Sequence, residues 1–199
     1  MATPKTPFKI KAGDNSPISP HFLRSEFYST SPRHGFGPVP SHPLFPQLVA
    51  AAEVLRAHFN TAWRITSTFR NEAHERAILD AQGVRYFFSQ HCQGKAFDSQ
   101  PSNNDPAILA AIAADFFAGG PLYVKLRKVG ITGFGVYDRF VHLDCRNDEF
   151  AAQRKDDFGS VAWWDSRAGK KKSWNGLYLI PTLTKRPILA ENQGQVVNA

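Results

Sequence analysis

The sequence predicts a single α+β domain, in which helices and short strands follow one another along the chain. Apolar residues recur at helical spacing in residues 46–59, and residues 63–67 then alternate in the manner of a strand. Two further strand-like segments, at 131–137 and 140–145, are joined by a tight turn. A chain of 199 residues is long enough for one substantial core and too short for two.

The N-terminal part is predicted to contribute little regular structure. Residues 1–20 are rich in Pro, Ser and Lys, so we expect an extended or poorly ordered lead-in. The amphipathic stretch 22–27 is expected to dock onto the core. Residues 29–46 contain five Pro, two Gly and two His, a composition typical of loop. His34 and His42 are therefore expected to be exposed loop residues rather than metal ligands.

Four helices are predicted from apolar periodicity and from the residues at their ends. Pro46 suits the first turn of the first helix, and Asn71 is a candidate N-cap of the second. Asp105 followed by Pro106 marks the start of the third, which is the most apolar. His74 falls in a polar first turn and is not expected to bind metal. The predicted ranges are 46–59, 71–83, 107–117 and 123–128.

Composition excludes several classes of protein. No apolar run approaches the ~20 residues of a membrane span. Lysines near the N-terminus are not followed by an apolar stretch, so we expect no secretory signal peptide. Two cysteines, Cys92 and Cys145, cannot build a disulfide framework. In a strand Cys145 would face away from His142, so a packed, reduced thiol is expected.

The positive charge is unevenly distributed along the chain. The net charge is +7, and residues 166–190 alone contain six Lys or Arg and no acid. A basic surface favours polyanionic partners, which include nucleic acid, an anionic membrane and an anionic cell envelope. Composition does not choose among these three.

Two short motifs carry the chemistry. His91, Gly94 and Asp98 lie in the first, where Gly94 disfavours a helix and favours a loop that leads into a strand at residues 95–99. His142 and Asp144 form the second and project from one face of the same predicted strand. Imidazole nitrogens and carboxylate oxygens are the ligands of a catalytic Zn²⁺, which takes three from the protein and keeps one position for water. The joint pattern predicts a metal site on the rim of a sheet.

These motifs resemble those of a known family. Ser89-x-His91-x-x-Gly94-x-Ala96-x-Asp98, followed by Phe-Val-His-Leu-Asp-Cys-Arg at 140–146, resembles the zinc D-Ala-D-Ala carboxypeptidase family, peptidase M15. The resemblance is closest to its small phage-type and murein endopeptidase branch and covers about residues 20–150. The strand that ends in Thr-Phe-Arg at 68–70 and the Gly-Phe-Gly-Val-Tyr segment at 133–137 add to it.

The resemblance implies a fold and a set of roles. The fold would be α+β of the Hedgehog/DD-peptidase type, with a small antiparallel sheet carrying the zinc site and helices packed on the other side. Residues 21–150 would form this peptidase domain, whereas composition alone predicts that residues 151–199 are a basic, Trp-rich extension packed on it. His91, Asp98 and His142 would be the zinc ligands, and a zinc-activated water would attack a peptide carbonyl. Arg70 would lie near the substrate carboxylate or the developing oxyanion.

The identity of the general base stays open, because this sequence departs from the pattern of the family. Several relatives carry an acid three residues before the second histidine, where this chain has Arg139. Periodicity favours Asp144, either as the base or as a residue that orients a ligand histidine, and Asp138 is the alternative. Ser89 is expected either to contact the metal or substrate or to stabilise a turn. Thr68 stands where the family usually has Gly, a difference that affects the local loop and not the metal ligands.

The leading functional hypothesis is a zinc peptidase that hydrolyses peptidoglycan stem peptides. We expect it in a phage or viral lysis context, in the host cytoplasm before release to the wall, or with the virion. One alternative is a non-catalytic, metal-stabilised binding protein. Another is single-stranded nucleic-acid binding through residues 166–190, where Trp174 and Tyr178 lie near the lysines 170–172. We favour an anionic wall polymer as the partner of that segment. Alternatively, Trp163, Trp164 and Trp174 pack the C-terminal extension on the core.

Overall fold

The computed structural model describes residues 6–28, 40–81, 83, 89–146, 155–156 and 159–168. His34, the lysines 170–172, Trp174 and Tyr178 lie outside these residues. Only residues 166–168 of the basic segment are described, so the predictions for that segment remain predictions.

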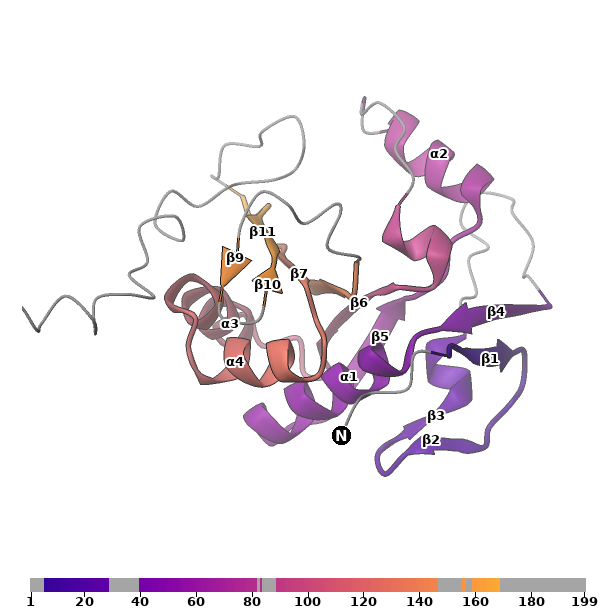
Figure 1. Cartoon of the computed structure of the whole chain (residues 1–199), viewed down its shortest axis with the longest axis horizontal. Helices are drawn as coiled ribbons and strands as arrows, with labels where there is room; N and C mark the ends of the chain where they lie inside the picture. Colours follow the sequence, from indigo (N-terminus) through magenta and orange to yellow (C-terminus); the bar gives the residue numbers. More distant parts are fainter. Residues whose placement is uncertain are drawn as a thin grey trace, which may run out of the picture.

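A five-stranded sheet forms the centre of the molecule (Figure 1), in the order β11-β7-β8-β6-β5. Four of its strands pair antiparallel, as the resemblance implies, whereas β11 joins the edge of the sheet parallel to β7. The parallel strand consists of residues 162–165, which therefore belong to the same sheet as the two motifs. The strands are β5 (Trp63–Ser67), β6 (Ala96–Pro101), β7 (Gly133–Val136), β8 (Val141–Asp144) and β11 (Ala162–Asp165).

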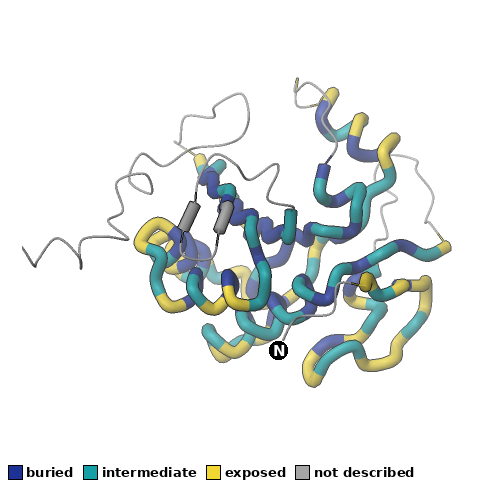
Figure 2. The backbone as a smooth tube through the Cα atoms, viewed as in Figure 1, coloured by how far each residue is buried: buried dark blue, intermediate teal, exposed yellow. Residues whose placement is uncertain are grey.

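The two faces of this sheet have different roles, because successive side chains of a strand alternate between them. Phe97, Phe134 and Leu143 are fully buried on the face that the helices cover. Asp98 and His142 project from the opposite face. The central strands are buried on both faces, while exposed residues lie on the outer turns of the helices (Figure 2). The covering helices are α1 (Pro46–Phe59), α3 (Pro106–Ala118) and α4 (Pro121–Lys128).

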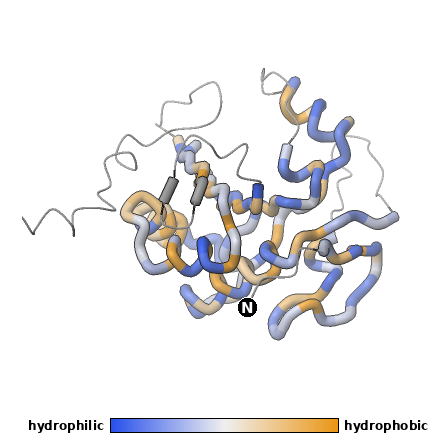
Figure 3. The backbone as a smooth tube through the Cα atoms, viewed as in Figure 1, coloured by the Kyte–Doolittle hydropathy of each residue, from blue (hydrophilic) through white to orange (hydrophobic). Residues whose placement is uncertain are grey.

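The helix ends confirm the predicted caps. The Asp105 carboxylate accepts a hydrogen bond from the backbone N–H of Ala107 at 2.8 Å, at the start of α3. Asn71 accepts in the same way from the N–H of His74, also at 2.8 Å, before α2 (Glu72–Ala81). Side-chain acceptors at these positions satisfy N–H groups that have no partner inside the helix. The helix α3 is largely hydrophobic along its length, whereas α2 is mostly hydrophilic (Figure 3).

The N-terminal segment is more ordered than the sequence predicts. Within the expected lead-in, β1 (Phe8–Lys11) pairs antiparallel with β4 (Ser41–Leu44), which lies in the stretch predicted as loop. Ile10 of β1 is fully buried in the core. The prediction of loop at 41–44 is wrong because a four-residue strand interrupted by proline has too few apolar positions to show a periodicity. The amphipathic stretch 22–27 docks as predicted.

His42 is also not the exposed residue that was predicted. The residue is only 3% exposed, and its ring stacks with those of Tyr28 and Phe69, at centroid distances of 5.8 and 5.2 Å. Burial lowers the pKa of His42, so the neutral ring is favoured. The loop composition around it gave no signal of this three-ring stack, since Phe69 is 27 residues further along the chain.

The remaining short elements complete the described structure. They are β2 (Pro17–Ser19), β3 (Phe22–Leu23), β9 (Lys155–Asp156), β10 (Gly159–Ser160) and the 3₁₀ helices η1 (Arg24–Phe27) and η2 (Gln90–Gln93). In the described part of the chain no single helix is long and apolar enough to cross a membrane. The helices α3 and α4 reach that length and apolar character only as a pair, and the angle between them is 76°.

The burial of Ile10 leads to a stability prediction. Ile10→Ala should lower the free energy of unfolding by about 2–5 kcal/mol, because it removes buried methyl groups and leaves a cavity. Lys11→Ala, at an exposed neighbouring position, should change it by about 0.5 kcal/mol or less. Urea unfolding followed by circular dichroism measures both. Equal, small effects would show that β1 is not part of the folded core.

Candidate metal centre

His91 is held by a short turn that fixes its backbone and its ring. The Ser89 hydroxyl accepts a hydrogen bond from the N–H of His91 at 3.3 Å and thereby caps the 3₁₀ helix η2. Gly94 ends this helix with φ of +69°, and a Cβ at this position would overlap the backbone of Pro43. His91 Nδ1 donates to the backbone carbonyl of Thr68 at 2.5 Å, which leaves Nε2 with a free lone pair.

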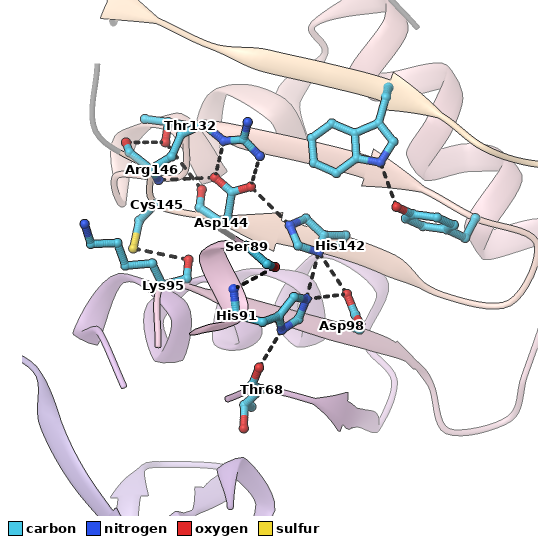
Figure 4. Close-up of polar contacts among 12 residues, drawn as sticks. Thr68, Ser89, His91, Lys95, Asp98, Thr132, His142, Asp144, Cys145 and Arg146 are labelled. Carbon is cyan, nitrogen blue, oxygen red and sulfur yellow. Dashed lines mark hydrogen bonds and ion pairs between the residues drawn. The ribbon is translucent and has the colours of Figure 1, made fainter. Parts of the chain in front are cut away.

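Asp98 and His142 face this nitrogen from the sheet. They lie directly opposite each other on the antiparallel strands β6 and β8, so both side chains project from the same face. His142 Nδ1 lies 2.9 Å from Asp98 Oδ1 and 3.2 Å from His91 Nε2, and the third separation, His91 Nε2 to Asp98 Oδ1, is 3.3 Å. The three side chains converge on one point (Figure 4).

The three atoms fit a divalent metal with tetrahedral coordination. Bonds of about 2.0–2.1 Å to nitrogen and oxygen give a tetrahedron with edges of about 3.3 Å. The observed separations of 2.9, 3.2 and 3.3 Å are close to those edges. All three residues are buried, and each offers the type of atom that zinc binds. His91, Asp98 and His142 could therefore hold a metal ion with one position left for another ligand.

Asp144 lies behind His142, on the side away from the convergent atoms. Its Oδ2 accepts from His142 Nε2 at 3.1 Å, which leaves the lone pair on Nδ1. Arg146 donates to both Asp144 oxygens, from Nε at 2.8 Å and from Nη2. Asp144 is fully buried, and Gly133 opposite it leaves the space that its carboxylate occupies. Of the two roles open to Asp144, these contacts favour the orientation of a ligand histidine over the activation of water.

Arg70 supports the other end of the site. Its Nη2 lies 2.5 Å from Asp98 Oδ2, its Nη1 donates to Glu75 at 3.1 Å, and its Nε donates to the Ser67 hydroxyl at 3.1 Å. The guanidinium thus binds the Asp98 oxygen that does not face the histidines. The structure places Arg70 beside the metal-binding carboxylate, with 16% of its side chain exposed.

The charges around the site favour a cation at its centre. Burial lowers the pKa of His91, and the positive charge of Arg70 lowers it further, so the neutral form that binds metal is favoured. Burial acts in the same direction on His142, but hydrogen bonds to Asp144 and Asp98 outweigh it and raise the pKa. Burial would raise the pKa of Asp98, yet His91 and Arg70 hold it well below its ordinary value. Asp98 is therefore a carboxylate.

Other predicted residues lie apart from the convergent atoms. Asp138, in the turn between β7 and β8, accepts from the backbone N–H of Ala168 at 2.7 Å and ties down the end of β11. Burial raises the pKa of Cys92 to about 11 and that of Cys145 to about 12, so both remain thiols. Neither cysteine belongs to the metal-binding group.

Three residues beside the site were not predicted from the sequence, namely Arg146, Tyr137 and Trp164. Trp164 packs on the His142 ring at a centroid distance of 5.1 Å and donates from Nε1 to the Tyr137 hydroxyl at 3.0 Å. Gly135 leaves room for this indole, but the sequence gives no signal of the contact because Trp164 lies 29 residues further along the chain. Arg146 ends the second motif, but nothing in the sequence indicates that it binds Asp144.

A metal-binding group of this composition, held on a small sheet, defines a candidate metallohydrolase site. A family model described as Peptidase M15 matches residues 20–144, which are 125 of the 199 residues. The chain belongs to the peptidase M15 family, whose members are hydrolytic peptidases.

Other comparisons add little. The L-Ala D-Glu endopeptidase ChiX of Serratia marcescens matches in structure with a TM-score of 0.32 and 16% identity, over 44% of this chain. The match spans 62% of the ChiX chain, so less than two thirds of its length is covered. This likeness is too weak to carry an argument. No curated protein matches the chain.

The position of Asp144 leads to a second prediction. Asp144→Asn should weaken Zn²⁺ binding by about 10- to 100-fold, because Arg146 loses its ion pair and His142 loses the carboxylate that orients it. The fold should be retained, since the amide has nearly the same shape. Competition with a chromophoric chelator measures the affinity. Asp138→Asn, the matched control, should change it by no more than about threefold. The reverse ranking would assign the orienting role to Asp138.

Proposed function

We propose that this protein is a zinc-dependent peptidase that hydrolyses the stem peptides of peptidoglycan. The observation that carries the proposal is the convergence of His91 Nε2, Asp98 Oδ1 and His142 Nδ1. Their separations of 2.9, 3.2 and 3.3 Å are close to those between the ligand atoms of a tetrahedral zinc site. Membership of the M15 family supports peptide hydrolysis. A bound Zn²⁺ would supply a Lewis acid and a water of lowered pKa.

The residues of this chain prepare that centre before any substrate binds. Thr68 fixes the tautomer of His91, and Asp144 fixes that of His142. Arg70 donates a hydrogen bond to Asp98 Oδ2, so Asp98 Oδ1 faces the histidines. These contacts hold the ligand atoms in place without reorganisation when the metal binds. Arg70 also lies beside Asp98 with 16% of its side chain exposed, which supports a role in stabilising a developing negative charge.

The substrate class rests on family resemblance and on charge. The motifs resemble the branch of the family that includes phage and murein enzymes, and a net charge of +7 favours an anionic target such as the cell wall. We place the protein in a lysis context, acting on the wall after release from the host cytoplasm or from the virion. A non-catalytic, metal-stabilised binding protein is the second candidate, since a structural metal would use the same three side chains.

The decisive experiment uses purified peptidoglycan. The zinc-loaded protein should release peptides, whose masses identify the bond cut, and a chelator should abolish the release. The His91→Ala/His142→Ala double variant should bind no zinc by elemental analysis and should release nothing. One zinc per chain without any release from the wall or from soluble stem peptides would favour the binding protein. Zinc retained by the double variant would exclude these ligands.

A further prediction concerns the lysines 170–172, which lie outside the described residues. Replacing all three by Ser should weaken binding to intact walls at low salt, because their attraction to an anionic polymer acts over roughly 8 Å at physiological ionic strength. The difference should vanish at high salt. Hydrolysis of a short, soluble stem peptide should be unchanged, and an equal loss of activity there would show that the lysines serve the site or the fold. A salt-dependent shift of single-stranded DNA would instead favour nucleic acid as the partner.

A further inference from the structure

The C-terminal strand places an indole beside a metal ligand. β11 pairs with β7 so that Trp164 lies opposite Gly135, Gly135 lies opposite His142, and His142 lies opposite Asp98. These four residues form one row across four strands, and their side chains share one face. Gly135 has no side chain in this row, and a Cβ there would overlap the indole of Trp164. The ring can therefore reach across β7 to His142, at 5.1 Å between centroids.

Trp164 also contacts the residues that support His142 from behind. The guanidinium of Arg146 lies 5.4 Å from the centre of the indole, in a cation–π arrangement. The same guanidinium binds Asp144, which accepts from His142 Nε2. On its other side the indole N–H donates to the Tyr137 hydroxyl at 3.0 Å. Trp164 is 6% exposed and the Arg146 side chain 14%, so the contact between them is largely shielded from water.

We propose that Trp164 is a positioning residue for His142, so that docking of β11 completes the metal centre. The indole limits rotation of the imidazole from one side, and through Arg146 it holds the carboxylate that fixes the imidazole tautomer. Metal binding and β11 docking then stabilise each other, because linkage between two equilibria is reciprocal. Trp164 lies outside residues 20–144, which match the family model. The inference rests on metal binding by the three ligands, as in the proposed function, but not on peptidase activity.

Variants of the two adjacent tryptophans test this role. Trp164→Leu removes the ring and should weaken Zn²⁺ binding by about tenfold or more, the effect typical of residues that orient a ligand. It should also change the visible absorption spectrum of the Co²⁺-loaded protein, which reports ligand geometry. Trp164→Phe keeps a ring against His142 and should recover most of the affinity. Hydrolysis of a soluble stem peptide by the zinc-saturated variants is a separate readout.

Trp163→Leu is the matched control. Trp163 is the preceding residue of the same strand, faces the core with 1% exposure, and lies away from the metal-binding face. Its loss should lower stability but leave the zinc affinity of the folded protein within about threefold of the original. Wild-type affinity and an unchanged Co²⁺ spectrum in Trp164→Leu would overturn the proposal. So would an equal loss of affinity in both leucine variants.

A measurement on the unchanged protein covers the case in which a leucine variant does not fold. The backbone N–H groups of Ala162 and Ser166 bond to Thr132 and Val136 and so report the docking of β11. Zinc at about 100 times its dissociation constant should slow their hydrogen exchange by about tenfold or more. The N–H of Arg24, bonded to Ser16 beside the β2–β3 pair, should be unaffected.

The outcomes of this measurement separate the two proposals. Zinc that binds without slowing exchange in β11 would overturn the coupling and leave the proposed function intact. Failure of the wild-type protein to bind zinc would overturn both. Zinc binding with slowed exchange but without release of peptides from the wall would support the coupling and count against the peptidase.

Discussion

The antiparallel pairing of β6 with β8 is the constraint on which the site depends. It sets Asp98 directly opposite His142, so that one carboxylate oxygen and one ring nitrogen lie 2.9 Å apart. A shift of this register by one residue would turn one of the two side chains to the other face, into the helix-covered core. Phe97 and Leu143 prevent that shift, because both are fully buried on the core face. The hydrophobic core and the metal centre therefore specify the same register from opposite faces of the sheet.

Buried charge is the second constraint. An uncompensated ion in the interior is costly, so each charged group beside the trio must have a partner of opposite sign. Arg70 lies between Glu75 and Asp98, and Arg146 binds Asp144. Two cations thus face three carboxylates, Glu75, Asp98 and Asp144, which leaves one negative charge over. The remaining negative charge, together with two imidazoles, favours a cation where the three ligand atoms meet. The contacts of Asp144 with His142 and Arg146 favour the orientation of a ligand histidine as its role.

Local signals predicted much of this arrangement. The apolar spacing of residues 46–59 gives the helix α1 with its observed bounds, and the alternation of 63–67 gives β5. The two-residue spacing of His142 and Asp144 places both on one face, as predicted. Such features depend on neighbours within a few residues, where side-chain period and capping chemistry determine the structure. The ligand trio needed the family resemblance as well, because spacing alone does not bring residues 91 and 142 together.

The features that the sequence did not predict all depend on contacts between distant segments. Ile10 pairs with His42 across the β1–β4 ladder, and the composition of neither strand indicates a partner. Trp163 and Trp164 are adjacent in sequence, yet the parallel pairing of β11 with β7 sends one indole into the core and the other to His142. Composition assigned both to a basic extension that binds a polymer or packs on the core. Successive side chains of a strand point to opposite faces of the sheet, so the two adjacent tryptophans have different roles. Trp163 packs in the hydrophobic core, and Trp164 packs against the metal centre.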